Sequence, residues 1–358
     1  MEVYYKMAIQ YLTQDAVPDF IETEEELDRF MSLPSKQLVD FQTDFDGDLI
    51  ILGVGGKIGV QLALTAKNAS EAAGLSRRII GVSRFSDERK RKQLENHGIE
   101  TISCDLSDPD AVEALPECKN VVFMVGRKFG TSGSEELTWA MNTLVPDYVS
   151  RKFSESNIIA YSTGNVYGLV PVSSGGSTET DPVKPQGEYA ISALGRERIF
   201  QYYSKKNRTP VAIIRLNYAI DLRYGVLREI GEKINNEEPI DVSMGNANVI
   251  WQGDAINQTL LSFSQCSSPA HIINITGPET VSIRYIAGLF SRILNKKLKL
   301  EGEENSTALL NNSSYAASLY GYPHVSLYTM VRWIAHWIKI GGASLNKPTH
   351  FESRNGKF

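Results

Sequence analysis

The sequence has few of the features that mark secreted, membrane-spanning or metal-binding proteins. Its three cysteines, Cys104, Cys118 and Cys266, are odd in number and far apart, which argues against a disulfide framework and predicts reduced, buried thiols in a cytoplasmic protein. The five histidines include no pair at the spacing of metal ligands, so we expect no metal site. No run of 18 apolar residues is present, and the N-terminus lacks the charged start, apolar core and cleavage site of a signal peptide.

Neither sign of charge dominates the chain. Its 37 Lys and Arg residues stand against 42 Asp and Glu residues, and the net charge of -5 argues against nucleic acid or an anionic membrane as a partner. Apolar residues make up 42% of the 358 residues and charged residues 22%, which is ordinary for a globular protein. The length allows one large or two modest domains with a sizeable core.

Beyond these absences, the sequence shows short apolar runs that alternate with helical patterns. From residue 48, the run "DLIILGVGG" precedes the helical pattern "KIGVQLALTAKNA", and later runs are "RRIIGVS", "IETISCDL", "NVVFMVG", "NIIAYST" and "TPVAIIRLNYAI". Continuous apolar strands that alternate with helices are typical of a parallel sheet covered on both faces. We therefore predict an α/β fold with a doubly wound parallel sheet over residues 47–220.

Three further segments flank the predicted sheet domain. Residues 1–46 predict a helical extension, in which Thr23 and Glu26 form a capping box, and we expect it to serve as a packing arm. Residues 221–340 contain shorter and more mixed elements, which predict a smaller lobe that mainly binds substrate. Residues 341–358 predict a polar and extended C-terminal tail.

A glycine array lies between the first predicted strand and the first predicted helix. Gly53, Gly56 and Gly59 would permit a tight turn and a close approach of the backbone to a pyrophosphate, whose oxygens the helix N-terminus would bind. A plain tight turn is the alternative, but the position at the head of a strand and helix series favours dinucleotide binding.

The end of the second predicted strand bears on the choice of dinucleotide. A carboxylate there would hold the ribose 2′-hydroxyl of NAD, but this sequence has Ser83 and Arg84. Arg84 could receive a 2′-phosphate, with Arg89 or Lys90 nearby, so NADP is slightly favoured over NAD. The alternative is that "DERKRK" is a solvated helix start.

Seven features in this order and spacing resemble a known family. They are "GVGGKIG", "DLSD", Asn142 in "WAMNT", "STGNVYG", Tyr189 with Glu197, "GDA" and "INITGPETVSIRYIA", and with them residues 48–340 resemble the extended short-chain dehydrogenase/reductases of the NAD(P)-dependent sugar epimerase/dehydratase group. The resemblance implies a Rossmann domain, a smaller C-terminal substrate lobe, a carbohydrate substrate, and homodimers formed through a helix bundle that includes the Tyr189 helix. It implies cofactor contacts at Gly53, Gly56, Lys57, Ile58, Gly59, Ser83, Arg84, Asp105, Leu106, Val125 and Gly126, and substrate contacts at Asn165, Asn217 and Arg223.

The family's chemistry is hydride transfer between a sugar carbon and nicotinamide. A Tyr takes the hydroxyl proton, a Ser or Thr hydroxyl binds the same oxygen, and a Lys one turn after the Tyr favours the phenolate, because an ordinary phenol is a poor base at neutral pH. Thr163 and Tyr189 match two of these positions, but Ala193 stands where the Lys is expected. We hypothesise that Lys128, in "MVGRKFG", supplies the missing charge, with Arg127 as second choice and a solvated loop lysine as the alternative.

Two other departures bear on the substrate. Gly164 and Asn165 replace the Asp-Glu pair of the family's dehydratases, which argues against a 4,6-dehydratase reaction. Ala247, seven residues before Asp254, replaces an Arg that holds the diphosphate of a nucleotide sugar.

These departures favour a free sugar, sugar acid or simple glycoside as the substrate of an NAD(P)-dependent oxidoreductase or epimerase. The alternatives are a dinucleotide-binding sensor or scaffold without turnover, and a sugar lyase or hydratase that works through a transient ketone.

Overall fold

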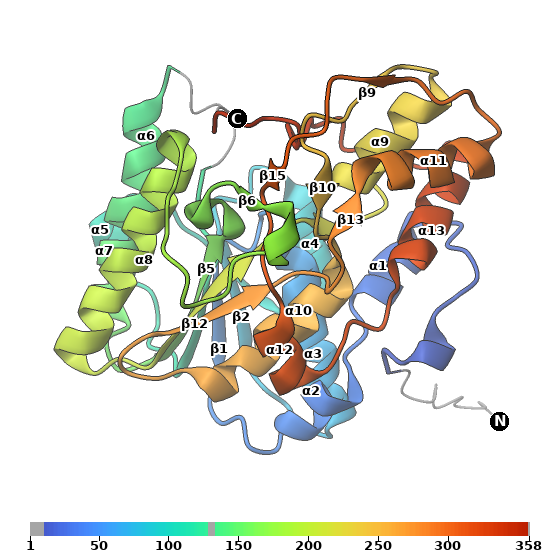
Figure 1. Ribbon diagram of the computed structural model, residues 1–358. Coiled ribbons are helices and arrows are strands. Elements are labelled where there is room, and N and C mark those ends of the chain that lie inside the picture. Colours follow the sequence, from blue (N-terminus) through green and yellow to red (C-terminus); the bar gives the residue numbers. More distant parts are fainter. Residues whose placement is uncertain (1–10, 128–132, 357–358) are drawn as a thin grey trace, which may run out of the picture.

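A seven-stranded parallel sheet lies at the centre of the computed structural model, which describes residues 11–127 and 133–356 (Figure 1). The strands follow the order β12-β7-β5-β4-β1-β2-β3, and the order reverses at β1 and β4, as in doubly wound folds. Each ladder of this sheet is parallel. The strands are β1 (Leu49–Leu52), β2 (Ile79–Ser83), β3 (Glu100–Ser103), β4 (Asn120–Phe123), β5 (Asn157–Thr163), β7 (Val211–Leu216) and β12 (His271–Ile275).

Successive side chains of each strand enter opposite helical layers. In β1, Leu49 and Ile51 join one apolar cluster while Ile50 and Leu52 join the other, so the whole strand is buried. The predicted α/β fold with a doubly wound sheet is confirmed. One layer contains α2 (Lys36–Phe41), α3 (Gly59–Ala72), α4 (Glu88–Asn96) and α10 (Gln252–Leu261), and the other contains α5 (Pro109–Glu113), α7 (Val145–Lys152) and α8 (Gly187–Asn207).

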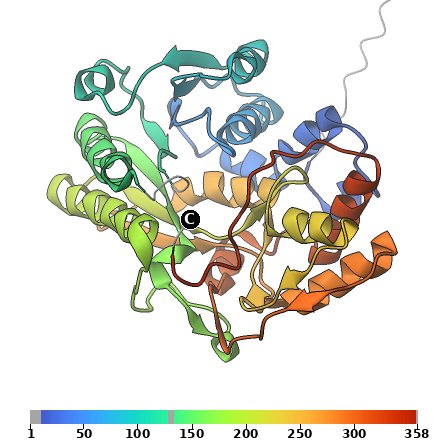
Figure 2. The same ribbon diagram turned by 90° about the horizontal axis from the view of Figure 1, so that it is seen from above.

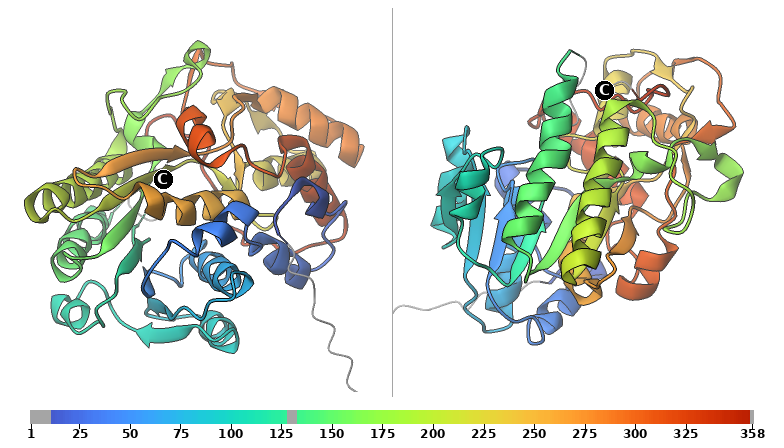
Figure 3. Two further views of the ribbon diagram at one scale, coloured as in Figure 1. Left: turned by 90° about the horizontal axis from the view of Figure 1, so that it is seen from below. Right: turned by 90° about the vertical axis from the view of Figure 1, so that its left-hand side faces the viewer.

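The second layer includes a helix with a π-helical turn. The helix α6 (Glu135–Trp139) passes through the π-helical turn η2 (Ala140–Leu144) into α7. This helix and α8 run side by side on one face of the molecule in the right-hand view of Figure 3. The side chain of Asn142, within η2, is buried. Because π-helical turns are frequent at functional sites, Asn142 is a candidate site residue.

The C-terminal lobe is built around three amphipathic helices. The helices α9 (Val226–Asn235), α11 (Ile283–Leu294) and α13 (Leu327–Lys339) share one apolar cluster, while α12 (Ser314–Tyr320) packs against β12. Short strand pairs lie outside the central sheet, within the lobe and where the lobe meets the sheet domain. They are β8 (Ala219–Ile220) with β11 (Ile250–Trp251), β9 (Ile240–Asp241) with β14 (Leu300–Glu301), β10 (Asn246–Ala247) with β13 (Val281–Ser282), and β6 (Val170–Pro171) with β15 (Thr307–Ala308).

The N-terminal segment is part of the core of this lobe. Thr23 caps α1 (Glu24–Met31) by accepting a hydrogen bond from the Glu26 backbone N–H at 3.1 Å, as the capping box predicts. The apolar face of α1, through Phe30, lies against Trp333 and Trp251. Trp333 Nε1 also donates to the backbone oxygen of Pro18 at 3.0 Å.

The C-terminal tail is extended and packs against the rest of the molecule. Phe351 is buried in the core of the lobe, and Arg354 donates to the backbone oxygen and the hydroxyl of Thr307. Gly356 then lies against Gly187, at the first turn of α8. Figure 2 shows the tail, in dark red, running from the C-terminal lobe to the middle of the molecule.

Candidate functional site

The glycine loop between β1 and α3 fits a dinucleotide. Gly53 has a φ of +91°, in the region that favours glycine, and a Cβ at Gly59 would lie 2.3 Å from the backbone oxygen of Val54. No side chain caps the N-terminus of α3, where Ile58 is the N-cap residue. The first backbone N–H groups of the helix therefore point toward the loop without a side-chain acceptor, as a pyrophosphate site requires.

Basic side chains lie at the end of β2. Arg84 is exposed, and Lys90 Nζ donates to the backbone oxygen of Gly55 in the glycine loop at 2.8 Å. Burial lowers the pKa of the Lys90 ammonium. Arg89, by contrast, is exposed and paired with Asp87. Lys90, rather than Arg89, is thus the basic residue held at the loop.

The remaining predicted cofactor contacts follow β2, β3 and β4. Ser83 ends β2 and lies against Gly55. Asp105 and the buried Leu106 follow β3, and hydrogen bonds from Ser107 hold the pKa of the Asp105 carboxyl below its ordinary range, with a smaller contribution from Arg84. Val125 and Gly126 follow β4 and lie close to the point at which the strand order reverses.

One cavity, of about 200 Å³, joins the glycine loop to the predicted catalytic residues. Ligands of open α/β sheets bind beyond the carboxyl ends of the strands, where this cavity lies. Its walls come from the glycine loop, β5 and the turn after it, α8, the end of β7 and the segment that follows, the start of α9, and the C-terminal tail. The lining residues are Lys57, Ile58, Ser162, Thr163, Asn165, Tyr189, Leu216, Asn217, Tyr218, Ala219, Tyr224, Gly225, Val226 and Thr349.

Thr163 and Tyr189 are brought together in this cavity. Thr163 ends β5, and its Oγ1 accepts a hydrogen bond from the Asn165 backbone N–H at 3.2 Å, so the hydroxyl hydrogen can still be donated. Tyr189 lies in the first turn of α8. The two predicted substrate residues Asn165 and Asn217 line the same cavity, and the buried Nδ2 of Asn217 has no hydrogen-bond partner among the described residues.

Two tyrosines and a lysine also line this cavity. Lys57 Nζ lies 3.4 Å from the centroid of the Tyr224 ring, a cation–π contact. Burial raises the pKa of Tyr224 to about 12 and also raises the pKa of Tyr218. Both phenols are therefore neutral hydrogen-bond donors at physiological pH.

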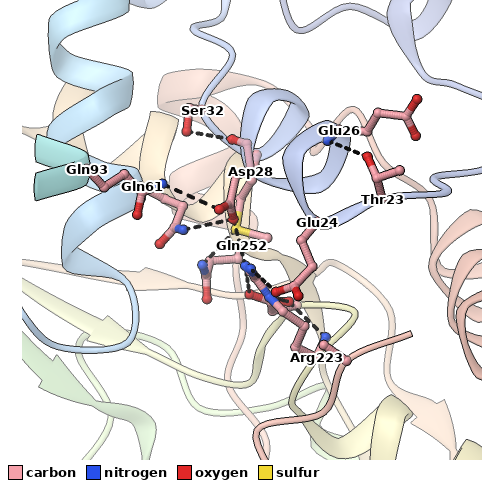
Figure 4. Close-up of polar contacts among 12 residues, drawn as sticks. Thr23, Glu24, Glu26, Asp28, Ser32, Gln61, Gln93, Arg223 and Gln252 are labelled. Atoms are coloured by element: carbon pink, nitrogen blue, oxygen red, sulfur yellow. Dashed lines mark hydrogen bonds and ion pairs between the residues drawn. The ribbon is translucent and has the colours of Figure 1, made fainter. Parts of the chain in front are cut away.

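The third predicted substrate residue, Arg223, lies outside the cavity lining. Its Nη2 is 2.9 Å from Asp28 Oδ1 on α1 and 2.9 Å from Asp221 Oδ2, and its Nη1 is 3.5 Å from Glu24 (Figure 4). Asp28 also accepts a hydrogen bond from Gln61 on α3. The Arg223 guanidinium thus connects the N-terminal helix to the sheet domain.

The position at which the family has a lysine is fully buried in this protein. Ala193 is 0% exposed and packs against Val166 and Tyr167. The predicted replacement, Lys128, lies outside the described residues. The backbone of Arg127, the second choice, exchanges hydrogen bonds with the side chain of Asn142 at 3.1 and 3.2 Å.

Sequence analysis missed Arg196, which is only 6% exposed beneath the site. Its Nη1 donates to the backbone oxygen of Tyr161 at 2.8 Å, and its Nη2 donates to Asn142 Oδ1. Burial lowers the pKa of this guanidinium, while Tyr189 and Glu197 oppose that shift. The signal in the sequence was its position three residues after Ala193, on the same face of α8.

The part of the chain that the structure describes offers neither a metal site nor a membrane-spanning helix. No group of three or more His, Cys, Asp and Glu side chains there could hold a metal ion. None of the described helices has both the length and the apolar character needed to cross a membrane.

Residues 49–220 match the model of the NAD dependent epimerase/dehydratase family, and no curated protein matches the chain in sequence.

Among solved structures, the chain is similar to the dTDP-glucose 4,6-dehydratase DesIV from Streptomyces venezuelae with NAD and TYD bound, at 14% identity and a TM-score of 0.69, over 82% of this chain and 97% of that one. It is also similar to UDP-glucuronic acid 4-epimerase from Bacillus cereus in complex with UDP-glucuronic acid and NAD, at 18% identity and a TM-score of 0.66, over 82% and 99% of the chains. A third is the UDP-glucose 4-epimerase of Thermus thermophilus in complex with NAD, at 16% identity, with the same TM-score and coverage. At these identities the likeness shows the fold.

Proposed function

Since the chain belongs, through residues 49–220, to the NAD dependent epimerase/dehydratase family of enzymes, we propose that it oxidises or epimerises a carbinol carbon of a carbohydrate with NAD(P). The observation that carries this proposal is the single cavity in which Thr163 and Tyr189 meet the end of the glycine loop. These side chains come from β5 and α8, far apart in the sequence, and their convergence supports a chemical role.

The roles of the two residues follow from their groups. As the substrate carbinol loses a hydride, its O–H proton moves to Tyr189 Oη and the carbon becomes a ketone. Thr163 donates its hydroxyl hydrogen to the same substrate oxygen, which orients it. A nicotinamide dinucleotide held at the glycine loop would supply the hydride acceptor, and an epimerisation would require the hydride to return to the other face of the same carbon.

The substrate we propose is a free sugar, sugar acid or simple glycoside. The cavity volume of about 200 Å³ is below the roughly 300–1,000 Å³ typical of ligand pockets, and Thr349 of the tail forms part of its wall. The guanidinium of Arg223 is paired with Asp28 and Asp221 rather than offered to a diphosphate, and Ala247 is buried and uncharged. A nucleotide sugar is the second candidate, because similar folds are solved with such ligands.

A 4,6-dehydratase reaction is not part of this proposal. A Cβ at Gly164 would lie 2.3 Å from Oδ1 of the buried Asn311 of the C-terminal lobe. The space for a carboxylate side chain at that position is therefore filled, which supports the interpretation of Gly164 as a departure from the dehydratase pattern.

The cofactor we propose is NADP in preference to NAD. Support comes from the exposed Arg84 and from Lys90 at the glycine loop, with no carboxylate at the end of β2. The similar solved structures contain NAD, which is the alternative.

Thermal unfolding with each dinucleotide tests the proposal. After any pre-bound cofactor has been extracted and identified by absorbance, a dinucleotide at about 100 times its Kd should stabilise the protein by roughly 2.7 kcal/mol. A panel of sugars, sugar acids and nucleotide sugars is then screened by absorbance at 340 nm for net oxidation and by NMR of the sugar for epimerisation, with Tyr189→Phe as the inactive control. If no dinucleotide is pre-bound or stabilises the protein, the redox function is rejected.

A further inference from the structure

The C-terminal tail forms part of the wall of the cavity that contains Thr163 and Tyr189. Thr349, in the tail, is only 4% exposed and lines this cavity. A second, smaller cavity shares Asn165 with the first and is also lined by the tail. One segment therefore bounds the site at two places, in the middle of the molecule as seen in Figure 2.

Hydrogen bonds to α9 fix Thr349 in this wall. Its backbone N–H and its hydroxyl both donate to Glu229 Oε2, at 2.9 and 2.6 Å. Its Oγ1 in turn accepts a hydrogen bond from the Phe351 N–H at 3.3 Å. Because hydrogen bonds to a carboxylate are stronger than those between neutral groups, Glu229 holds Thr349 in one orientation.

The tail is also attached on both sides of Thr349. Before it, the Leu345 N–H donates to the backbone oxygen of Arg223 at 3.0 Å. After it, the backbone of the tail lies against the start of α8, where a Cβ at Gly356 would be 2.2 Å from the backbone oxygen of Gln186. Thr349 therefore cannot leave the cavity without the loss of contacts along the tail.

The chemistry of this cavity suits a carbohydrate with little charge. Apart from Lys57, at the glycine loop, the described residues of its lining are neutral. Asn165, Asn217 and Tyr218 offer amide and hydroxyl groups that can bind sugar hydroxyls. The buried Nδ2 of Asn217 has no hydrogen-bond partner among the described residues, so a ligand oxygen would complete it. A diphosphate, by contrast, carries more than one negative charge and needs cationic partners.

We propose that Thr349 is a specificity-determining residue, which closes the cavity at the tail and limits the substrate to a single sugar unit. This inference rests on the proposed function, since it concerns the substrate of the same site. A nucleotide sugar carries a nucleoside diphosphate in addition, whereas the cavity, at about 200 Å³, is smaller than the roughly 300–1,000 Å³ of typical ligand pockets. Admission of the larger ligand requires the tail to move.

A reporter thiol tests this barrier without substrate or cofactor. Ala219→Cys places a thiol in the lining of the cavity, and the unsubstituted protein corrects for labelling of the native cysteines. The small reagent iodoacetamide and the bulky fluorescein maleimide are compared by mass spectrometry, each rate being divided by the rate in urea-unfolded protein. With the tail intact, the normalised rate of the maleimide should be lower by about tenfold or more, because thiol reactivity depends on access.

Changes in the tail should remove this difference. Added to Ala219→Cys, either Thr349→Gly or Glu229→Ala should raise the maleimide rate by about tenfold. Thr349→Ser and Glu229→Gln keep the hydrogen-bonding groups and should stay within about twofold of the intact tail. Lys347→Ala, at an exposed position of the same tail outside the lining of this cavity, is the matched control and should also stay within about twofold.

Ligand choice gives a second measurement. The panel of free sugars, sugar acids and nucleotide sugars is assayed with the unsubstituted protein and with Thr349→Gly. The glycine variant should raise kcat/KM for nucleotide sugars relative to free sugars by about tenfold, because the wall no longer excludes the larger ligand.

Several outcomes would overturn the inference. Equal normalised rates of the two reagents with the tail intact would show that the tail is no barrier, and this comparison still decides if Thr349→Gly fails to fold. A thiol that neither reagent reaches would show that small ligands are excluded as well. An unsubstituted protein that prefers a nucleotide sugar to every free sugar would also contradict the size limit. Failure of the proposed function appears separately, as the absence of dinucleotide binding, because the alkylation needs no cofactor.

Discussion

Gly59 and Ala193 are both small residues in the site, but their small size has different origins. Gly59 is small because the backbone of Val54 fills the space that a side chain would need. Ala193 is small at a position where the family's chemistry calls for a long cation, and its methyl group is buried against Val166 and Tyr167. The first residue is thus small because of the local backbone, and the second is a departure from the family's pattern.

Gly59→Ala should destabilise the protein and weaken dinucleotide binding. The added methyl would meet a backbone oxygen at 2.3 Å, so α3 must move away from β1, at a cost of about 1–3 kcal/mol. Gly288→Ala is the matched control, since no atom lies within 4 Å of its Cβ, and it should stabilise α11 by up to about 1 kcal/mol. Urea unfolding and dinucleotide titration measure both effects. Equal stabilities of the two variants would contradict the tight contact.

The three thiols should resist alkylation in the native protein at pH 8. Burial raises the pKa of Cys104, of Cys118 to about 11 and of Cys266 to about 12. A shift of two units upward leaves about a hundredfold less thiolate, the reactive form, at this pH. Mass spectrometry after iodoacetamide treatment, with urea-unfolded protein as control, should show slow native labelling. Rapid labelling of one cysteine would reveal an accessible thiol.

At the scale of elements, local patterns predicted much of the fold and part of the site. The strands, the glycine loop, Thr163 and Tyr189 depend on short spacings, which a sequence displays directly. The burial of Arg196 was not visible, because it depends on contacts with Tyr161 and Asn142 from other elements. The two terminal segments were hard to place for the same reason, since Pro18 pairs with Trp333, 315 residues away, and Thr349 pairs with Glu229, 120 residues away.

Helix α1 tests this long-range packing. Phe30→Ala should cost about 3–5 kcal/mol of folding free energy, because the ring is buried against Trp251 and Trp333. Glu25→Ala, on the exposed face of the same helix, is the control and should change the stability by less than about 0.5 kcal/mol. Chemical denaturation followed by tryptophan fluorescence measures the difference. Similar losses of unfolding free energy in the two variants would show that the packing of α1 does not stabilise the fold.

At the scale of the whole molecule, one face carries unusually exposed apolar side chains. They lie on the α6–η2–α7 helix and on α8, and are Leu137, Trp139, Leu144, Ile191 and Tyr202, with exposed fractions of 38–57%. Such a patch is typical of an interface, and the family resemblance implies a homodimer built from these helices.

We predict that the protein is a homodimer and that the pair Leu144→Arg and Ile191→Arg makes it monomeric. Two buried charges at a symmetric interface oppose each other and lose their hydration, so the association should weaken by at least tenfold. Analytical ultracentrifugation measures the change. Tyr322→Arg, at a position that is 73% exposed and away from these helices, is the control. A monomeric parent protein would disprove the prediction.

The position of the N-terminal segment also has a consequence during synthesis. The indole of Trp333 binds the backbone of Pro18, which lies 315 residues earlier. At about 5–20 residues per second, the ribosome delivers this partner roughly 15–60 s after the segment itself. Until then the apolar face of α1 has no core to enter, and the sheet domain must form beside an exposed hydrophobic helix. Helix α1 is therefore among the last elements to fold, although it is translated well before its partners, and a stalled nascent chain would present it to chaperones.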